Sequence, residues 1–341
     1  MGYVQMHRQQ LGFFPTPIVK LPRLSKKLGG PRILMKRDDQ TGLALGGNKV
    51  RKLEYLVGEA LAGGYDTLIT GGAEQSNHCR QTAAAAAACG LPCHLVLGGE
   101  PPDVPNGNLL LNGLFGAKIH WTGELRKGEK IPEIADQIRE SGSKPYIVPY
   151  GGSNSTGAVG FVEAVRELVS QLAELEETVT QIVFASSSGG TQAGLIVGRS
   201  IFDQHFQLIG IGIDKDEAGD RPFDELVLSL ANSTAQRLEA GLTFTHSDII
   251  IRNEYFGDGY GVVGELERRA IQVTAETEGI LVDPVYTGRA MGALIDMVER
   301  REFSQDDTVL FWHTGGTPAL FPYAGEIANL KPKPAKPASG S

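Results

Sequence analysis

The chain has 341 residues and a formal net charge of −8. Its length predicts about two domains, and its negative charge disfavours a nucleic-acid partner because phosphates would be repelled. The chain contains no apolar run long enough to span a bilayer, and residues 1–10 lack the apolar centre of a signal peptide. We therefore expect a cytoplasmic protein that binds neither nucleic acid nor membrane.

The three cysteines lie close together in the sequence, at Cys79, Cys89 and Cys93. An odd number in one short region argues against a disulfide framework and indicates free thiols in a reducing compartment. The cysteines also lack the paired ligands that a zinc site needs, so we expect no metal.

Strand and helix patterns alternate along the chain. Short apolar runs that end in glycine or polar residues predict strands, and amphipathic or alanine-rich runs predict helices. The expected strands are 32–37, 67–70, 94–97, 118–121, 146–148, 181–185, 208–213 and 309–312. The expected helices are 24–28, 77–88, 107–115, 132–141 and those that start near Lys49, Thr156 and Gln192.

This alternation predicts parallel strands joined by helical crossovers, with ligands at the carboxyl ends of the strands. The fold class is therefore α/β, with two doubly wound open-sheet domains. We expect a smaller domain at 48–155 and a larger one formed by 1–47 and 156–330. The Pro/Lys/Ser-rich tail, 331–341, is expected to be disordered.

The stretch 41–54, TGLALGGNKVRKLE, places Lys49 directly after a Gly-Gly-Asn loop and at the start of a helix. A lysine held there, partly out of water, has a disfavoured ammonium and an amine available for a Schiff base. The alternative interpretation is a solvated helix face formed by Lys49, Arg51 and Lys52.

Three further loops follow predicted strands. The run 186–191, SSSGGT, precedes a helix and could hold a phosphate by backbone N–H groups, or be only a tight turn. The run 71–80 places Gln75, Ser76 and Asn77 at a helix start, which suits either a substrate carboxylate or an ordinary N-cap. The third loop, 313–316, is either only a turn or a loop that places Thr314 to bond a ring nitrogen.

Two tyrosines have the same ambiguity. Tyr286, in DPVYTGR, could stack on a flat cofactor or place a hydroxyl near the reacting atoms, and Tyr260 lies between glycines in GDGYGV. Each could equally be a half-buried loop tyrosine.

Taken together, these loops resemble the fold type II pyridoxal-phosphate enzymes, which have the tryptophan synthase β-like fold. Within them they are most similar to the family of D-cysteine desulfhydrase and 1-aminocyclopropane-1-carboxylate deaminase. The matching pieces are KRDDQTGLALGGNKVRKLE, GGAEQSNHCRQTAA, GGSNSTGAVGF, SSSGGTQAGL, GYGV, DPVYTGRAMGALID and HTGGTPALF. They cover nearly the whole chain from Phe14 to Tyr323.

The resemblance implies pyridoxal 5'-phosphate as the cofactor, an amino-acid substrate and a homodimer. It makes Lys49 the Schiff-base lysine and a general base or acid. It implies that Asn77 bonds the cofactor's phenolic oxygen, that Tyr286 stacks near its ring and that Thr314 faces its ring nitrogen. It implies that the phosphate is held by Ser188, Gly189, Gly190 and Thr191. It places on the substrate side Asn48, Gln75, Ser76, Asn77, Tyr260 and Thr287, with Ser76, Tyr260 and Tyr286 as further catalytic candidates.

Position 287 divides this family. Aminocyclopropane-carboxylate deaminases have an acidic residue after the tyrosine, whereas this chain has Thr287. A neutral hydroxyl implies a weaker electron sink, which is adequate for β-elimination. We therefore expect D-cysteine to be converted to pyruvate, hydrogen sulfide and ammonia.

Three alternatives stay open: aminocyclopropane-carboxylate deamination, sulfite elimination from L-cysteate, and a cofactor-binding protein without catalysis. A sulfonate substrate would require a cation near its β-carbon, and the sequence offers no evident candidate.

Overall fold

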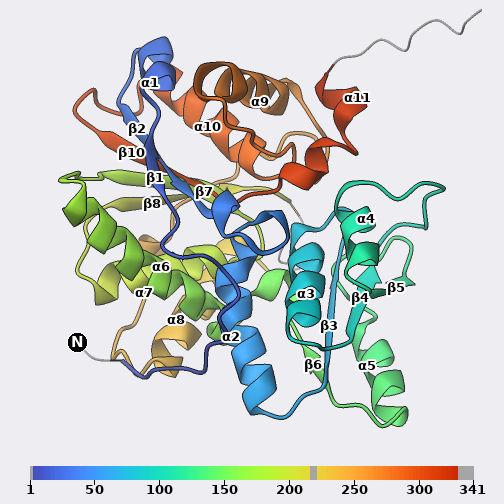
Figure 1. The fold of residues 1–341 in the computed structure, drawn as a ribbon. Coiled ribbons are helices and arrows are strands. Elements are labelled where there is room, and N and C mark those ends of the chain that lie inside the picture. The colour runs from blue at the N-terminus through green and yellow to red at the C-terminus, as the bar shows by residue number, and fades with distance from the viewer. Residues whose placement is uncertain (1–2, 216–220, 329–341) are drawn as a thin grey trace, which may run out of the picture.

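The computed structural model describes residues 3–215 and 221–328, and these residues form two open β-sheets with helices on both faces of each (Figure 1). The expected tail lies outside the described residues. No helix in the described ranges is long and apolar enough to cross a membrane. The α/β fold with two open sheets agrees with the alternation in the sequence.

The larger sheet has six strands in the order β1-β2-β10-β7-β8-β9. Its strands are parallel except β1, which pairs antiparallel with β2 at one edge. Since only the short helix α1 lies between β1 and β2 in the chain, the connection is short, as an antiparallel pair allows. The strands are β1 Ile18–Lys20, β2 Arg32–Arg37, β7 Gln181–Ser186, β8 Gln207–Gly212, β9 Ile251–Arg252 and β10 Thr308–His313.

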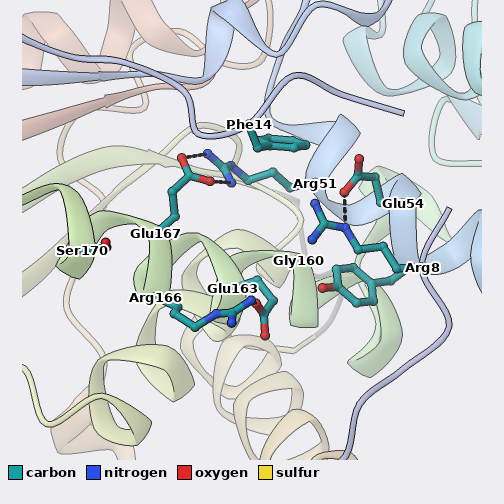
Figure 2. Close-up of a pocket in the computed structure, with 10 residues that line it drawn as sticks. Arg8, Phe14, Arg51, Glu54, Gly160, Glu163, Arg166, Glu167 and Ser170 are labelled. Carbon is teal, nitrogen blue, oxygen red and sulfur yellow. Dashed lines mark hydrogen bonds and ion pairs between the residues drawn. The ribbon is translucent and has the colours of Figure 1, made fainter. Parts of the chain in front are cut away.

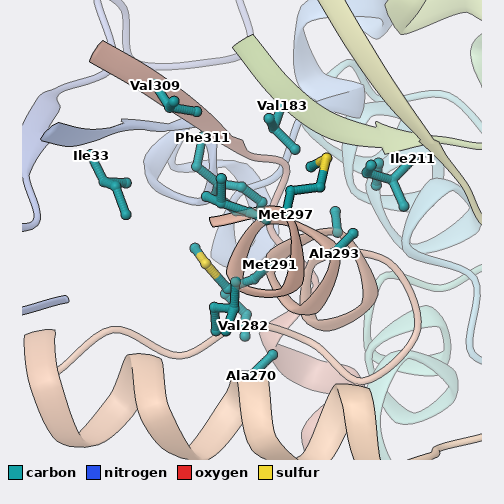
Figure 3. Close-up of a cluster of buried hydrophobic side chains, with 14 of the residues drawn as sticks. Ile33, Val183, Ile211, Ala270, Val282, Met291, Ala293, Met297, Val309 and Phe311 are labelled. Atoms are coloured by element: carbon teal, nitrogen blue, oxygen red, sulfur yellow. The ribbon is translucent and has the colours of Figure 1, made fainter. Parts of the chain in front are cut away.

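Neighbouring residues of these strands face opposite cores because side chains alternate along a strand. Val183 and Phe311 contribute to the core under α9 and α10, shown in Figure 3, whereas Phe184 and Trp312 contribute to the core under α6, α7 and α8. Both faces are therefore dry. The helices of this unit are α1 Pro22–Leu28, α6 Ser155–Glu174, α7 Gly190–Ile201, α8 Phe223–Arg237, α9 Glu265–Glu278, α10 Thr287–Glu299 and α11 Ala324–Ile327.

The smaller sheet has four parallel strands in the order β5-β4-β3-β6. One face packs on α2, α3 and α4, and the other on α5. The strands are β3 Thr67–Gly72, β4 Cys93–Leu97, β5 Lys118–Trp121 and β6 Pro145–Ile147. The helices are α2 Lys49–Ala62, α3 Asn77–Ala88, α4 Gly107–Leu114 and α5 Ile131–Glu140.

Helix α2 lies between the two sheets (Figure 1) and is tied to the larger one by Arg51. The Arg51 guanidinium donates to both oxygens of Asp38 at 2.8 Å and to both oxygens of Glu167 at 2.9 Å, the latter pair shown in Figure 2. Lys36 adds a second cation to Glu167, with its Nζ 2.5 Å from Oε1. Burial raises the pKa of Glu167, but Arg51 and Lys36 outweigh it and lower that pKa to about 2.

The structure corrects one interpretation of the sequence. Arg51 and Lys52 are only 4% and 1% exposed, so the hypothesis of a solvated helix face is wrong for them. In α6, Val159, Val162 and Val165 are buried, and Val169 is partly buried against the same core. The division of the chain at residues 48 and 155 stays a prediction.

Most predicted elements are present, and several have the predicted bounds. The strands at 32–37 and 118–121 and the helix at 77–88 match those of the structure. Helices α8, α9 and α10 and strands β1 and β9 were not predicted. Strand β9 has only two residues, too few for a recognisable alternation.

We predict that stability depends on the ionised Glu167. Because its folded pKa lies below the usual value of a glutamate, its contribution is present above about pH 4.5 and is lost as the pH falls toward 2. The contribution is on the order of 3 kcal/mol. In urea titrations from pH 7 to pH 2, Glu167→Gln should therefore be less stable at pH 7 and lose less stability on acidification than the native chain. Parallel pH profiles for the two proteins would contradict this account.

Candidate functional site

Loops from both sheets line one cavity at the start of α2. The loops after β3, β6, β7 and β10 all contribute, as expected for parallel strands whose carboxyl ends meet. The lining residues are Asn48, Lys49, Ser76, Asn77, His78, Tyr150, Gly151, Ala185, Ser186, Ser187, Ser188, Gly189, Thr191, Tyr286 and Thr314.

The loop before Lys49 is fixed by its glycines. Gly46 and Gly47 have φ of 70° and 132°, in the left-handed region that favours glycine. A Cβ on Gly46 would lie 1.9 Å from the carbonyl oxygen of Asp39. The next residue, Asn48, donates from its backbone to the carbonyl of Thr314 at 3.0 Å, so the start of α2 is joined to the end of β10. These contacts hold Lys49 at the cavity wall.

Lys52 is a buried lysine one turn after the half-buried Lys49, on the same face of α2. Its Nζ donates to the carbonyl of Gly151 at 3.1 Å and to the hydroxyl of Ser153 at 3.0 Å, and it forms no ion pair with a carboxylate of residues 3–215 or 221–328. Burial and the charge of Lys49 hold the pKa of Lys52 well below its usual range. An anion bound nearby would therefore raise this pKa and favour the charged form of Lys52, with which no carboxylate of the described residues is paired.

Ser153 connects Lys52 to the loop after β7. Its hydroxyl lies 2.7 Å from Ser188 Oγ and accepts from the backbone N–H of Gly190 at 3.2 Å. Gly189, with φ of 78°, precedes α7 and turns the chain so that the positive end of that helix faces the cavity. The loop 186–191 thus has the geometry of an anion-binding cup rather than of a turn alone.

The start of α3 forms the opposite wall. The hydroxyl of Ser76 accepts from Cys79 N at 3.2 Å, so it is an N-cap, and it also lines the cavity. Asn77 accepts from the Asn108 amide at 2.9 Å, which orients its own amide. Gln75 instead bonds Asn108 N and the carbonyl of Asn106, and it is not among the lining residues.

Tyr286 lines the cavity and contacts Tyr260, which is not a lining residue. Its hydroxyl lies 2.5 Å from that of Tyr260, and the two rings meet edge to face with centroids 5.9 Å apart. Thr314 lines the cavity from the end of β10. The two tyrosines, separate candidates in the sequence, are therefore in contact in the structure.

The structure places Thr287 beneath the cavity and not in its wall. Thr287 is fully buried, and its hydroxyl donates to Asp283 Oδ1 at 2.6 Å. Asp283 also accepts from the backbone N–H groups of Val285, Tyr286 and Thr287, so its carboxylate caps α10. An acid at position 287 would lie beside this buried carboxylate, and one of the two would have to hold a proton.

His78 is a buried lining residue to which the sequence gave little weight. Its Nε2 lies 2.8 Å from the hydroxyl of Thr70, and that hydroxyl also lies 2.9 Å from the carbonyl of Val148. Because the carbonyl can only accept, Thr70 donates to Val148 and accepts from Nε2–H. Burial and the charges of Lys49 and Lys52 lower the pKa of His78 well below its usual range, which leaves Nδ1 as an acceptor.

A second cavity, of about 300 Å³, lies between α2 and α6 (Figure 2). Three arginines and three glutamates line it, and each arginine is paired: Arg51 with Glu167, Arg8 with Glu54 at 2.6 Å, and Arg166 with Glu163. With its charges already compensated, this cavity offers no unmet charge for a ligand. The described residues also contain no group of three or more His, Cys, Asp or Glu side chains placed to hold a metal.

Of the predicted site residues, the structure brings most to one cavity. The exceptions, which are not among its lining residues, are Gln75, Gly190, Tyr260 and Thr287. Sequence reasoning missed Lys52, Ser153, Tyr150 and His78. The spacing of Lys49 and Lys52, three residues apart on a helix, was the available signal for the first of these.

The donor set fits pyridoxal phosphate. A dianionic phosphate would meet the N–H groups before α7, the hydroxyls of Ser188 and Thr191, and the ammonium of Lys52. Lys49, on the same face of α2, is placed for an aldehyde, and Tyr286 for a flat ring. The site thus provides an anion cup, an amine and an aromatic wall within one cavity.

Comparison with known proteins agrees with this geometry. Residues 9–315 match the family described as "Pyridoxal-phosphate dependent enzyme". The chain is 44% identical over 315 residues to a D-cysteine desulfhydrase of Klebsiella pneumoniae (strain 342), a match that covers 91% of this chain and 94% of that protein. It is 45% identical over 317 residues to one of Salmonella choleraesuis (strain SC-B67), with the same coverage.

Solved structures agree as well. A structure described as an "ACC deaminase homologue" has a TM-score of 0.87 and 35% identity, and the match covers 96% of this chain and 97% of that one. Diaminopropionate ammonia lyase of Escherichia coli, with a TM-score of 0.68, 16% identity and coverage of 95% and 88%, shares the fold. The resemblance found in the sequence is therefore confirmed: the chain belongs to the pyridoxal-phosphate-dependent enzymes.

Proposed function

We propose that this enzyme is a lyase that converts D-cysteine to pyruvate, hydrogen sulfide and ammonia by β-elimination. The observation that carries the proposal is the arrangement of Lys49 beside an anion cup backed by the uncompensated Lys52. The choice of D-cysteine is supported by the relatives of that activity, which are 44–45% identical over nearly their whole length.

The residues of the cavity divide the work. Lys52, Ser188 and Thr191 hold the phosphate, and Asn77 and Thr314 hold polar atoms of the ring. Ser76, with the N–H groups at the start of α3, binds the substrate carboxylate. Bound pyridoxal phosphate supplies the electron sink for the charge left when the Cα proton is removed.

Lys49 or a nearby hydroxyl moves the Cα proton. Lys49 Nζ lies 3.4 Å from Asn48 Oδ1, and Asn48 in turn donates to Thr191 at 3.2 Å, so the amine is oriented from the phosphate side. The paired hydroxyls of Tyr260 and Tyr286 offer a second route, since one can donate to the other at 2.5 Å.

The chemistry at position 287 favours elimination over ring opening of aminocyclopropane carboxylate. The carboxylate nearest Thr287 is that of Asp283, and it is already occupied by three backbone N–H groups and the threonine hydroxyl. We infer that it has little capacity left to act on the ring nitrogen, so the nitrogen meets only the neutral Thr314.

We propose further that the enzyme is a homodimer. Leu45, 62% exposed with φ of 66°, is a strained and exposed apolar residue in the loop before Lys49. Residues 43–45 pack on α3, α3 packs on α4, and α4 packs on residues 317–320. Leu45, Leu114 of α4 and Phe321, which follows residue 320, are exposed along this series of contacts. The exposed Phe13 covers Gly42, in the loop of Leu45. An apolar surface of this kind is typical of an interface between subunits.

We propose the cytoplasm as its location, because Cys79, Cys89 and Cys93 are all free thiols.

The first prediction tests the reaction. The purified enzyme should absorb visible light through its Schiff base and form pyruvate from D-cysteine faster than from L-cysteine or L-cysteate. Its kcat/KM for D-cysteine should also be higher than its kcat/KM for aminocyclopropane carboxylate, measured as formation of 2-oxobutyrate. Lys49→Ala should lose the Schiff-base band and lower kcat by about 100-fold or more, whereas Lys130→Ala, at an exposed lysine of another helix, should change neither. A higher kcat/KM for aminocyclopropane carboxylate would reject the proposed substrate.

The second prediction tests Lys52. Since its pKa is held low in the empty site and a phosphate would raise it, cofactor binding should take up protons, and affinity should weaken as the pH rises. Lys52→Met should bind pyridoxal phosphate about 10- to 100-fold more weakly and take up fewer protons. Proton uptake in weak buffer and equilibrium dialysis measure the two effects, with Lys20→Met as the surface control. Equal proton uptake by Lys52→Met and the native protein would remove Lys52 from the phosphate site.

The third prediction concerns the subunit interface. Sedimentation should give twice the chain mass of 36.5 kDa, and Phe13→Ser combined with Leu45→Asn should shift the protein toward the monomer. Asparagine tolerates the left-handed conformation at position 45, so the loop itself is preserved. Leu175→Asn, at a leucine 46% exposed at the far end of α6, serves as the matched control. A native protein that sediments as a single chain would contradict the proposal.

A further inference from the structure

Arg126 joins a loop of the smaller sheet to a loop of the larger one. It lies between β5 and α5 of the four-stranded unit, and its Nη2 donates to Asp214 Oδ2 at 2.5 Å, just beyond the end of β8 in the six-stranded unit. Gly98 makes room for it, because a Cβ there would lie 2.6 Å from the Cβ of Arg126. The contact therefore connects the carboxyl-end loops of both sheets.

The guanidinium of Arg126 also lies over a tyrosine of the site. Its Cζ is 4.7 Å from the ring centroid of Tyr260, whose hydroxyl is 2.5 Å from that of the cavity residue Tyr286. The loop of Tyr260 is held from below by the buried Arg289, which donates to the carbonyls of Gly259 and Val262 at 3.1 and 3.0 Å. Tyr260 is thus fixed between two arginines.

One end of Arg126 has no protein partner. Its Nη1 is buried and forms no hydrogen bond with any residue of the described ranges. Burial lowers the pKa of Arg126, but Asp214 outweighs it, with smaller contributions from Tyr150 and Tyr260, so the guanidinium stays charged. Tyr150 lines the cavity, so the charge of Arg126 acts on one residue of the cavity wall and on Tyr260, which contacts the wall residue Tyr286. A buried donor left unsatisfied is costly, which favours a ligand that accepts from it.

We propose that Arg126 determines specificity for the substituent on the substrate's β-carbon, by donating from Nη1 to the thiol sulfur as that sulfur becomes anionic on leaving. This inference rests on the proposed function, which places the α-carboxylate at the start of α3 and leaves the other end of the substrate toward Tyr260. The sequence offered no cation for this position, because Arg126 and Tyr260 lie 134 residues apart and only the fold brings them together.

Such a donor suits the elimination step. The electron pair left at Cα when its proton is removed forms the Cα–Cβ double bond, and the Cβ–S bond breaks with both of its electrons on sulfur. Sulfur leaves as HS⁻, whose charge the guanidinium stabilises without transferring a proton. A chloride leaving group accepts hydrogen bonds weakly and depends less on such a donor.

The experiment compares two substrates in three variants. Arg126→Met should lower kcat/KM for D-cysteine by about 10- to 100-fold and that for β-chloro-D-alanine by a much smaller factor, while Arg126→Lys should restore part of the loss. Arg252→Met is the matched control, since Arg252 also forms ion pairs and lies over a tyrosine ring, that of Tyr255, away from the cavity. An equal fall for both substrates, or no fall, would overturn the proposal.

A binding measurement separates this proposal from the proposed function. D-Aspartate carries an anion on its β-carbon and D-alanine does not, and neither has a sulfur to lose. Both Kd values are measured through the absorbance of the bound cofactor. The ratio of the Kd for D-alanine to the Kd for D-aspartate should be about 10-fold or more higher in the native enzyme than in Arg126→Met. The same ratio of the two Kd values in both proteins would overturn the role of Arg126 even if D-cysteine is the substrate. A native enzyme that shows the ratio but forms no pyruvate from D-cysteine would reject the proposed function alone.

Discussion

Burial of two consecutive cations on α2 is the constraint on which the site depends. Arg51 and Lys52 have almost no contact with water, yet their environments differ. Arg51 meets the two carboxylates of Asp38 and Glu167, which compensate its charge and fix the helix against the larger sheet. Among the residues that the structure describes, Lys52 donates to a carbonyl and a hydroxyl and to no carboxylate. Arg51 therefore stabilises the contact of α2 with the larger sheet, whereas Lys52 favours the binding of an anion in the adjacent cavity.

The position of α2 explains why the site forms where it does. The helix lies between two sheets whose parallel strands point their carboxyl ends toward its first turn. Each sheet supplies part of the cavity: the smaller one the start of α3, and the larger one the loop before α7 and the end of β10. Asn48 hydrogen-bonds Thr314 and Thr191, so the neighbouring Lys49 is held in a fixed position relative to the larger sheet. The start of α3, from the smaller sheet, faces Lys49 across the cavity.

The sequence predicted the strands, the lysine loop and the phosphate loop because each is encoded locally. The backbone geometry is predictable where it requires particular residue types. Glycines such as Gly46 and Gly47, and the small residues of 186–191, indicate conformations that larger residues rarely adopt. The burial of Arg51 was not predictable in this way, since its partner Glu167 is 116 residues away. A charged residue near a helix start is typically exposed, and only tertiary contacts reverse that expectation.

The same limit applies at the other end of the substrate path. The role of Thr287 in distinguishing this chain from the deaminases stays a prediction, and its burial beside Asp283 was not encoded in the motif. Tyr260 and Tyr286 were identified separately, and their contact depends on how the loop before α9 folds over α10. Local motifs thus give the chemical groups, whereas the distances between them arise from the packing of the two sheets.

Trp312 gives the Arg51 network an optical consequence. The chain has two tryptophans, and this one is fully buried and donates its indole N–H to Asp38 at 2.8 Å, the carboxylate that also holds Arg51. The other, Trp121, lies half-buried on the outer strand of the smaller sheet. Indole fluorescence is sensitive to the polarity and charge around the ring, so the emission of Trp312 is coupled to the anchorage of the catalytic helix. The protein carries its own fluorophore at the point where that helix is held.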